Sequence, residues 1–449
     1  MLDILKRNQY ILLALIAGIT LGLINHFISL LMFIKLILAG IIAVLIFWQP
    51  QLGVFMVAGL IPVLPTQYLM ILSAISFISL AARSYFFNEP LFQFSTLNLF
   101  SMLFAANVVY GVLISFNRGE SFYVAMIYLA YIAFYFTLQK SLDSENLVYI
   151  AMTLMVTAGF AVSVLGIFQY ITGLDTTALW IDQNLFSGIE TRVYGTLDNP
   201  NVFGNYLQVL IPFSVFLFIV NKDRLARIYF ASATVFMVIS LIFTYSRSSW
   251  MGVLLSLIVF TLLMPRQLLP FAAGGVIVTP VVLSYVPSVL ARLKGLGSLA
   301  DSSTRYRVAV WMSSLEIIKD YWPCGIGMGY ENFNRMLSNY AGSDIVAIHS
   351  HNTFLQVTCE TGIMGFLLFV SLIIFYVRIC LSAYKTSTNH FIKTLSTALL
   401  SSMSGYVLIC LFDNTLYDHS LKLIFWTMLG LCAALHRMTA HYTGGEPKS

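Results

Sequence analysis

Long apolar runs occupy most of the sequence. A helix needs roughly 20 apolar residues to cross hydrocarbon about 30 Å thick, and about fourteen runs here approach that length. They cover residues 8–25, 28–48, 51–65, 67–87, 94–115, 121–139, 146–171, 201–220, 226–245, 248–264, 268–286, 352–378, 390–412 and 419–437. With 59% hydrophobic and only 10% charged residues, the chain cannot be an ordinary soluble globule. We predict an all-α, polytopic membrane bundle of about 12–14 transmembrane helices.

Two of the runs are unusual. The run at 51–65 is short and carries Pro62 and Pro65, so we interpret it as a re-entrant or half-spanning element. The run at 8–25 is too long for a cleaved signal peptide and is followed by another apolar run, which predicts a retained helix. Cys324 stands alone in a long loop and the other cysteines lie in predicted spans, so no disulfide framework is expected.

Basic residues mark one set of connections. If Lys6 and Arg7 are cytoplasmic, the cytoplasmic connections and tail hold Arg83, Lys140, Lys222, Arg224, Arg227, Arg266, Arg378, Lys385, Lys393, Arg437 and Lys448. The short external turns hold only Arg118, Arg247 and Lys422. This bias predicts two cytoplasmic termini and an even number of spans. It also accounts for the net charge of +5 without a nucleic-acid partner.

Two longer connections then fall on the external side. They divide the chain into N-terminal spans (1–171), central spans with an external loop at 172–200 (172–286), a large external loop (287–351), and C-terminal spans with a short tail (352–449). The large loop gathers cations and imidazoles: Arg292, Lys294, Arg305, Arg307, Lys319, Arg335, His349 and His351. In a chain with so few charges, this grouping indicates a site at the membrane face.

The first polar motif runs from Thr191 to Asn201, before an apolar run. Asn199-Pro200 signals a turn, and Asn201 can cap the helix that follows. Arg192 has two readings. It can be an interfacial arginine that extends to the membrane surface, or an anion clamp beside a helix N-terminus, whose free N–H groups favour phosphate.

The second motif, Tyr245–Trp250, forms a tight turn between two runs. An arginine such as Arg247 is costly inside hydrocarbon and common at its edge. With Trp250 it can be an interface anchor. The serines at 246, 248 and 249 favour a buried, water-lined site as the other reading.

The third motif is a predicted helix that starts near Asp301–Thr304 and ends at Pro323. An apolar stripe at helical spacing predicts that this helix lies along the membrane interface; its members are Val308, Trp311, Leu315 and Ile318. Arg307 shares a face with Trp311, whereas Arg305 points elsewhere. The following Gly325-Ile-Gly-Met-Gly329 lacks a preceding strand, so it predicts a sharp loop with close backbone approach more than a nucleotide site.

The fourth motif is His349-Ser-His351-Asn-Thr-Phe-Leu355. Two histidines need further ligands to hold a metal, and no cysteine or carboxylate cluster lies near them in sequence. We interpret His351 as a general base, since an imidazole pKa of about 6.5 suits proton removal from a hydroxyl. A capping or lipid-interface histidine is the alternative. Glu360, in the next helix, can orient a catalytic group or make a structural polar contact.

Together the four motifs resemble the O-antigen ligase and O-antigen polymerase superfamily of polytopic glycosyltransferases, the Wzy_C group. The resemblance covers roughly residues 190–370. It rests on Arg192 with Gly195–Asn201, on Ser246–Gly252, on Arg307–Trp311 with Pro323 and Gly325–Gly329, and on His351–Leu355 with Glu360–Gly365.

The resemblance implies an all-helical bundle with a large external loop, in a bacterial inner or plasma membrane. It implies a glycan donor linked to a lipid diphosphate, usually undecaprenyl diphosphate, and an acceptor that is a glycan or lipid-linked. Polysaccharide-assembly proteins are further expected partners, and no cofactor or obligatory metal is expected. The implied catalytic residues are His351 and Arg307. Arg192, Arg247 and Arg305 are implied to bind the diphosphate together with Arg307. The implied supporting residues are His349, Glu360 and Asn201.

The expected function is therefore glycan transfer at the external membrane face in cell-surface polysaccharide synthesis. We favour a polymerase over a ligase because no feature points to a non-polymer acceptor, and transfer to protein hydroxyls is a third variant. The alternative from another class is a transporter of a glycolipid or small anion. Apart from Lys35, ionisable residues are nearly absent from mid-span positions, which speaks against transport. A non-catalytic scaffold would leave the arginines and histidines unexplained. The sugar, its linkage and the oligomeric state stay open.

Overall fold

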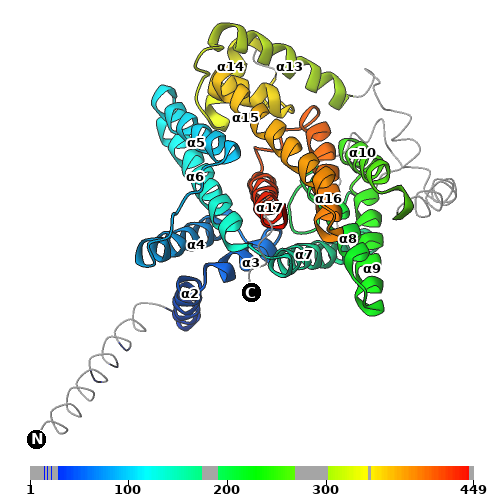
Figure 1. The fold of residues 1–449 in the computed structure, drawn as a ribbon. Helices are drawn as coiled ribbons and strands as arrows, with labels where there is room; N and C mark the ends of the chain where they lie inside the picture. The colour runs from blue at the N-terminus through cyan, green and yellow to red at the C-terminus, as the bar shows by residue number, and fades with distance from the viewer. Residues whose placement is uncertain are drawn as a thin grey trace, which may run out of the picture.

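The computed structural model describes residues 29–173, 191–267, 302–341 and 345–443, together with the isolated residues 15, 18 and 22. These ranges hold helices and loops and no strand. The helices, labelled as in Figure 1, are α2 (Leu30–Trp48), α3 (Pro50–Leu60), α4 (Thr66–Phe86), α5 (Thr96–Ile114), α6 (Arg118–Ser141), α7 (Glu145–Thr172), α8 (Pro200–Val220), α9 (Arg224–Phe243), α10 (Arg247–Leu263), α13 (Ser302–Tyr321), α14 (Tyr330–Ala341), α15 (Thr353–Thr386), α16 (His390–Cys410) and α17 (His419–Thr443).

The helix lengths confirm the predicted all-α, polytopic membrane fold. Ten of the described helices are long and apolar enough to cross a membrane. The run at 51–65 contains only the 11-residue α3, as expected of a half-spanning element. The runs at 8–25 and 268–286 lie almost wholly outside the described residues, as do 174–190 of the first external loop and 287–301 of the second.

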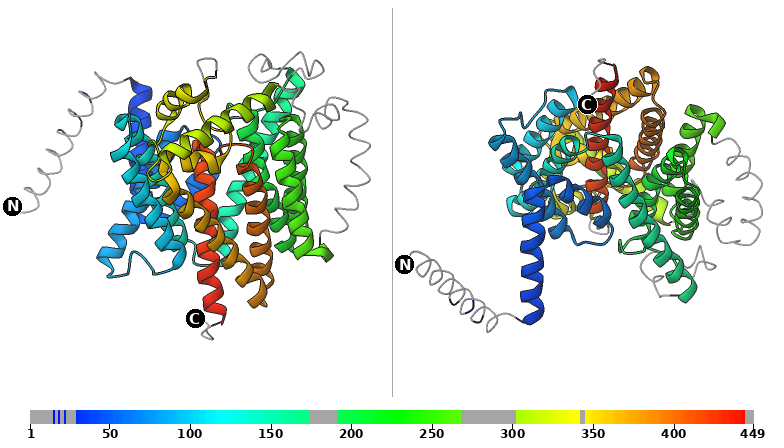
Figure 2. Two further views of the ribbon diagram at one scale, coloured as in Figure 1. Left: turned by 90° about the horizontal axis from the view of Figure 1, so that it is seen from above. Right: turned by 60° about the horizontal axis from the view of Figure 1, so that its bottom comes forward.

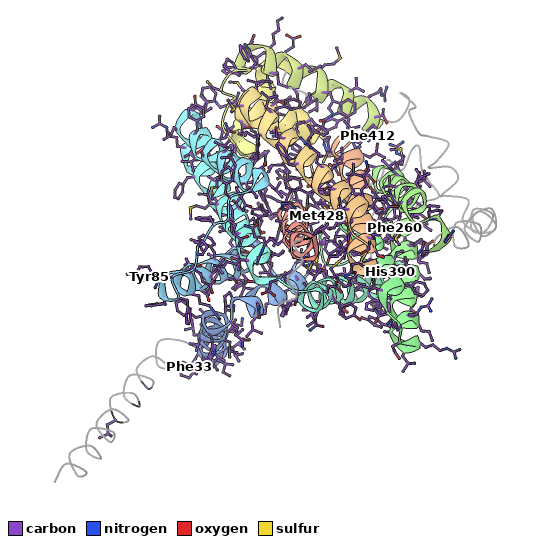
Figure 3. All side chains as sticks on the ribbon, viewed as in Figure 1. Phe33, Tyr85, Phe260, His390, Phe412 and Met428 are labelled. Atoms are coloured by element: carbon purple, nitrogen blue, oxygen red, sulfur yellow. The ribbon has the colours of Figure 1, made fainter. Side chains whose placement is uncertain are left out.

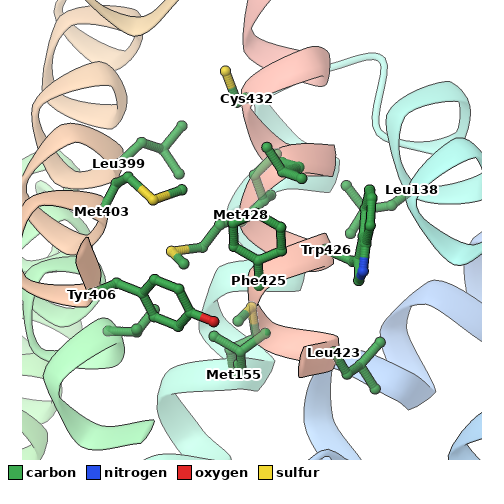
Figure 4. Close-up of a cluster of buried hydrophobic side chains, with 14 of the residues drawn as sticks. Leu138, Met155, Leu399, Met403, Tyr406, Leu423, Phe425, Trp426, Met428 and Cys432 are labelled. Atoms are coloured by element: carbon green, nitrogen blue, oxygen red, sulfur yellow. The ribbon is translucent and has the colours of Figure 1, made fainter. Parts of the chain in front are cut away.

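The bundle is built around α17. In its most apolar window 83% of residues are buried, against 6% for α2 at the edge. Figure 4 shows how the centre is filled: Phe425, Trp426 and Met428 of α17 pack among residues of neighbouring helices, including Leu138, Met155, Leu399, Met403 and Tyr406. With all side chains drawn, Met428 lies at the middle of the bundle and Phe33 at its rim (Figure 3). Apolar composition alone does not distinguish these helices, because lipid accepts apolar side chains as readily as a core does.

Two helices form a cap, defined here as α13 and α14, across one end of the bundle. The left view in Figure 2 shows them lying over the ends of the upright helices. They share a small core of their own, made by Val310, Ile317, Ile326, Phe333 and Leu337 among others. The cap is bound to the beginning of α6, because Asn117 N–H donates to Asn332 Oδ1 at 2.9 Å.

The predicted apolar stripe of α13 is not the buried face of this helix, and its place along the membrane interface stays a prediction. Leu315 is 54% exposed, while Val310 and Ile317 are fully buried and Ser314 is buried with them. The reason is tertiary: α13 packs on α14 and α15, and this face differs from the one that the apolar spacing favours. The expected helix start at Asp301 lies outside the described residues, and α13 is described from Ser302.

A glycine-rich loop locks the cap onto α15. Gly362 interrupts α15 with φ +67° and ψ −170°, which frees backbone groups of this helix. Ile326 N–H donates to Cys359 O at 2.8 Å, and Gly327 N–H donates to Glu360 O at 3.1 Å. A Cβ on Gly325 would lie 2.5 Å from the backbone of Glu360. The close backbone approach predicted for Gly325–Gly329 is therefore confirmed.

Candidate functional site

The beginning of α15 is fastened to the α16–α17 turn, residues 411–418. Asn352 caps α15 by accepting Leu355 N–H at 3.0 Å, and its amide donates to Leu411 O at 3.1 Å. The backbone N–H and hydroxyl of Thr353 both donate to Asp413 O, at 3.1 and 2.9 Å. These bonds hold the His349–His351 segment against the turn that carries Asp413.

His351 sits in an uncommon backbone conformation. Its φ is +50°. This conformation costs a non-glycine residue energy, and it persists because the surrounding structure holds it in place. Its backbone N–H donates to His349 Nδ1 at 3.1 Å, and the two imidazole rings lie 4.2 Å apart. Asp198 and Tyr245, in the first two motifs, also have positive φ. Backbone strain thus recurs in the segments that carry the candidate residues.

A carboxylate faces the imidazole of His351. Asp413 Oδ1 lies 3.8 Å from His351 Nδ1, an ion-pair distance that is longer than a hydrogen bond. The Nδ1 atom is buried and has no hydrogen-bond partner. Burial by itself raises the pKa of the Asp413 carboxyl, but its contact with His351 and the nearby Arg307 guanidinium outweigh burial and hold that pKa below its usual range.

The environment of His349 favours its neutral form. Burial, with smaller contributions from His351 and Arg307, lowers its pKa to about 3 against the opposing effect of Asp413. A neutral imidazole can keep Nδ1 as an acceptor, which is the role it has toward His351 N–H.

The cap helix α13 supplies two further contacts. Arg307 donates to Phe412 O at 2.9 Å, next to Asp413, and Trp311 Nε1–H donates to His351 O at 3.4 Å. These residues share a face, as the helical spacing predicted. Arg305 is exposed and points elsewhere, also as predicted.

Arg192 is buried, with 4% of its surface exposed. Its Nε–H donates to Thr244 O at 2.8 Å, and its Nη2 donates to Asn201 Oδ1 at 2.9 Å. The reading of Arg192 as an interfacial arginine extended to the surface is therefore wrong. The expected cap at Asn201 is also wrong: Asn199 caps α8 by accepting Asn201 N–H, and this leaves the Asn201 side chain for Arg192.

A chain of hydrogen bonds joins the four motifs. Ser249 Oγ donates to Ser246 Oγ at 2.8 Å or to Asn205 Oδ1 at 2.7 Å. Asn205 Nδ2 donates in turn to Asp413 Oδ2 at 3.3 Å. Thr244, which accepts from Arg192, is also bound by Ser246 N–H at 3.2 Å. Arg247, the first residue of α10, thus belongs to a segment connected to both Arg192 and Asp413.

The sequence of this region matches a known family. Residues 232–370 match the family model Wzy_C, described as O-antigen ligase. This range is similar to the O-antigen ligase family. Comparison with curated proteins gives no match. The resemblance inferred from the four motifs is confirmed over the matched range, which contains Arg247, Arg307 and His351; Arg192 and Asp413 lie outside it.

Glu360 is connected to the segment of the histidine pair through Gln356. Gln356 accepts Ser350 N–H at 2.7 Å and donates its Nε2–H to Glu360 Oε1 at 2.9 Å. Gly329 N–H donates to the same Glu360 oxygen at 3.3 Å. The structure therefore places Glu360 behind the segment that carries His351, next to the cap loop.

Three donor atoms near the histidine pair have a spacing that could hold a metal. Atoms of His349, His351 and Asp413 lie within 4.8 Å of one another. Against a cation at this place, His349 Nδ1 already accepts a hydrogen bond, and the Arg307 guanidinium adds positive charge beside the set. The expectation that this protein needs no metal stays a prediction.

Sequence reasoning missed Asp413 and Asn205. Asp413 belongs to a short polar segment, Asp413-Asn-Thr415, between two apolar runs on the predicted external side. That signal was available, but nothing local to it indicates His351 as its partner. Asn205 lies inside an apolar run, where a fully buried amide has no distinguishing pattern.

Proposed function

We propose that this protein is a membrane glycosyltransferase of cell-surface polysaccharide synthesis. It transfers a glycan from a lipid-diphosphate carrier to an acceptor hydroxyl at the membrane face where the cap lies. The similarity to the O-antigen ligase family supports the reaction class. The observation that carries the proposal is the meeting of His351, Asp413 and Arg307, in one hydrogen-bonded network with the segments of Arg192 and Arg247.

The transfer exchanges one bond at the anomeric carbon for another. The acceptor oxygen forms a bond to this carbon, and the bond from this carbon to the diphosphate oxygen breaks. His351 takes the proton of the acceptor hydroxyl as it attacks. The ionised Asp413 facing Nδ1 stabilises the imidazolium that forms, as a buried carboxylate does beside a catalytic histidine.

The leaving lipid diphosphate carries away the bonding electrons and gains negative charge. Guanidinium groups bind such oxygens by charge-assisted hydrogen bonds and stay protonated when partly desolvated. Arg307 binds Phe412 O beside Asp413, and Arg192 and Arg247 belong to segments that hydrogen bonds connect to Asp413. Arg305 is the outermost candidate, because it is exposed on α13. Stabilising the leaving group is expected to lower the barrier more than base catalysis does.

The finer assignments are part of the same proposal. We place the cap and His351 on the external side of a bacterial inner or plasma membrane, with both termini in the cytoplasm, because the basic residues follow that orientation. We propose undecaprenyl diphosphate as the carrier and favour polymerisation over ligation.

Product length tests the function directly. Purified protein is incubated with a lipid-diphosphate oligosaccharide, and the products are separated by size. A ladder supports a polymerase, and one discrete adduct supports a ligase. Uptake of the donor into vesicles without bond formation would overturn the proposal in favour of transport. A His351→Ala variant that inserts normally into the membrane is the matched inactive control.

A further inference from the structure

A cavity of about 360 Å³ has in its wall Tyr417, whose ring lies 4.8 Å from the ring of His349. Its walls come from α6, from the start of α14, from α15, and from the α16–α17 turn with the start of α17. Three carboxylates, Glu120, Glu360 and Asp418, and the ammonium of Lys422 line it together with tyrosines. We infer that this cavity, here called the Lys422 cavity, binds one neutral sugar residue of the acceptor glycan. The inference rests on the proposed function and names its acceptor subsite.

Lys422 gives the first reason. It is 2% exposed, and its ammonium lies 4.1 Å from the centre of the Tyr128 ring. In the described part of the chain no hydrogen bond or ion pair reaches this ammonium. A buried cation with three N–H donors is costly unless acceptors are supplied. The cavity that Lys422 lines is where a ligand oxygen can supply them.

The carboxylates give the second reason. Glu360 Oε1 accepts from Gln356 and from Gly329 N–H, and Asp418 Oδ1 accepts Ser420 and Leu421 N–H at the start of α17. These bonds fix the carboxylates in place, and each carboxylate has about four lone-pair sites, so capacity remains for a ligand. A group that donates to carboxylates and accepts from an ammonium is needed. A sugar hydroxyl does both.

Shape and charge narrow the ligand further. Tyr128 and Tyr417 add aromatic surface to the lining, in a cavity near the lower end of the range for ligand pockets. Three carboxylates against one ammonium disfavour a uronic acid or a phosphate. Their oxygens do not form a compact metal-binding group within the described residues. A neutral hexose or N-acetylhexosamine fits these conditions.

The cavity adjoins the proposed base. The ring of Tyr417, a cavity residue, lies 4.8 Å from the ring of His349. Asn414, another cavity residue, directly follows Asp413. Gln356 connects Ser350 N–H, between the two histidines, to Glu360. A sugar held in the Lys422 cavity therefore lies next to His349, whose ring centre is 4.2 Å from that of His351.

The test measures sugar binding without any donor. Full-length protein in detergent micelles is titrated with methyl α-D-glucopyranoside, methyl β-D-galactopyranoside, methyl N-acetyl-β-D-glucosaminide and methyl α-D-glucuronide, with saturation-transfer NMR as readout. We expect at least one neutral glycoside to bind saturably and the glucuronide to bind about tenfold more weakly or not at all. Lys422→Met should weaken neutral-glycoside binding about tenfold or more. Lys319→Met, at an exposed lysine paired with Glu316, should not change it.

Several results overturn the inference: no saturable glycoside, equal binding by wild type and Lys422→Met, or preference for the glucuronide. If Lys422→Met does not fold, Glu120→Gln, at the partly exposed rim of the cavity, takes its place. Neutral-glycoside binding by Glu120→Gln equal to that of the wild type would overturn the inference. Glycan transfer is assayed in parallel with the wild-type protein. Normal glycan transfer without sugar binding overturns only the proposal that the Lys422 cavity binds a sugar. Sugar binding without glycan transfer overturns the proposed function.

Discussion

Asp413 Oδ1 lies 3.8 Å from Nδ1 of His351, although the whole of α15 and of α16 separates the two residues in the chain. The pair exists because Thr353, at the start of α15, donates twice to Asp413 O. The same carboxylate accepts from Asn205 of α8. One aspartate thereby connects the candidate base to the segments that carry the candidate diphosphate ligands.

This pairing predicts the largest losses of activity at two positions. His351→Ala should slow glycan transfer by about 10²–10⁴-fold, because the acceptor hydroxyl loses its base. Asp413→Asn should slow it as well, since a neutral amide does not stabilise the imidazolium. Initial rates with purified variants measure both effects. Arg335→Ala, at an exposed position of α14, is the matched control and should retain the wild-type rate. Wild-type rates for His351→Ala would exclude it as the base.

The two arginines of α13 should differ. Arg307 donates to Phe412 O beside Asp413, whereas Arg305 is exposed. We therefore expect Arg307→Ala to lower the transfer rate by about tenfold or more, and Arg305→Ala to have a clearly smaller effect. Rates at saturating donor concentration compare the two. An equal loss in both variants would show that proximity to Asp413 does not decide their roles.

The interruption of α15 should require glycine. A Cβ on Gly362 would lie 2.6 Å from Pro323 O, at a backbone φ of +67°. Gly362→Ala should cost about 1–3 kcal/mol and lower the thermal midpoint in detergent. Gly40→Ala, within α2 where a Cβ meets nothing within 4 Å, should cause no loss. A Gly362→Ala midpoint equal to that of Gly40→Ala would contradict the strained contact.

Acid should destabilise the protein through His349. Its pKa in the folded state, about 3, lies below its value of about 6.5 in an unfolded chain. Between these values the unfolded state binds more protons, so stability is greatest above pH 6.5 and falls as the pH drops through this window.

Thermal midpoints at pH 7 and pH 5 measure this effect for the wild type and for His349→Gln. The decrease should be smaller in the variant. Burial raises the pKa of Asp418 to about 6, which acts in the opposite direction, but both proteins contain Asp418 and the comparison removes it. An identical decrease in the two proteins would disprove a neutral, buried His349.

Chelation should leave transfer unchanged. His349 Nδ1 is already engaged by His351 N–H, and Arg307 places positive charge near the only compact donor set among the described residues. Transfer rates before and after EDTA treatment test this expectation. Loss of activity that added Zn²⁺ or Mg²⁺ restores would show that the histidines and Asp413 bind a metal.

Much of the architecture followed from local patterns. Apolar runs of membrane length predicted the spanning helices, and two prolines marked the short α3. Helical spacing placed Arg307 and Trp311 on one face, and alternating glycines predicted the close loop against α15. These inferences succeed because the bilayer, the α-helix and glycine impose constraints that act over a few neighbouring residues. The catalytic and diphosphate-binding roles assigned to individual residues stay predictions.

The sequence alone determined an all-α membrane bundle with polar motifs gathered on one side. Only the tertiary structure decided which side chains meet. It buried Arg192 against Thr244, paired His351 with Asp413, and turned a different face of α13 inward from the one its apolar spacing favoured. It also enclosed Lys422 among carboxylates from other helices. The physical reason is that these contacts depend on how helices pack against one another. Sequence periodicity indicates only which residues share a face of a single helix.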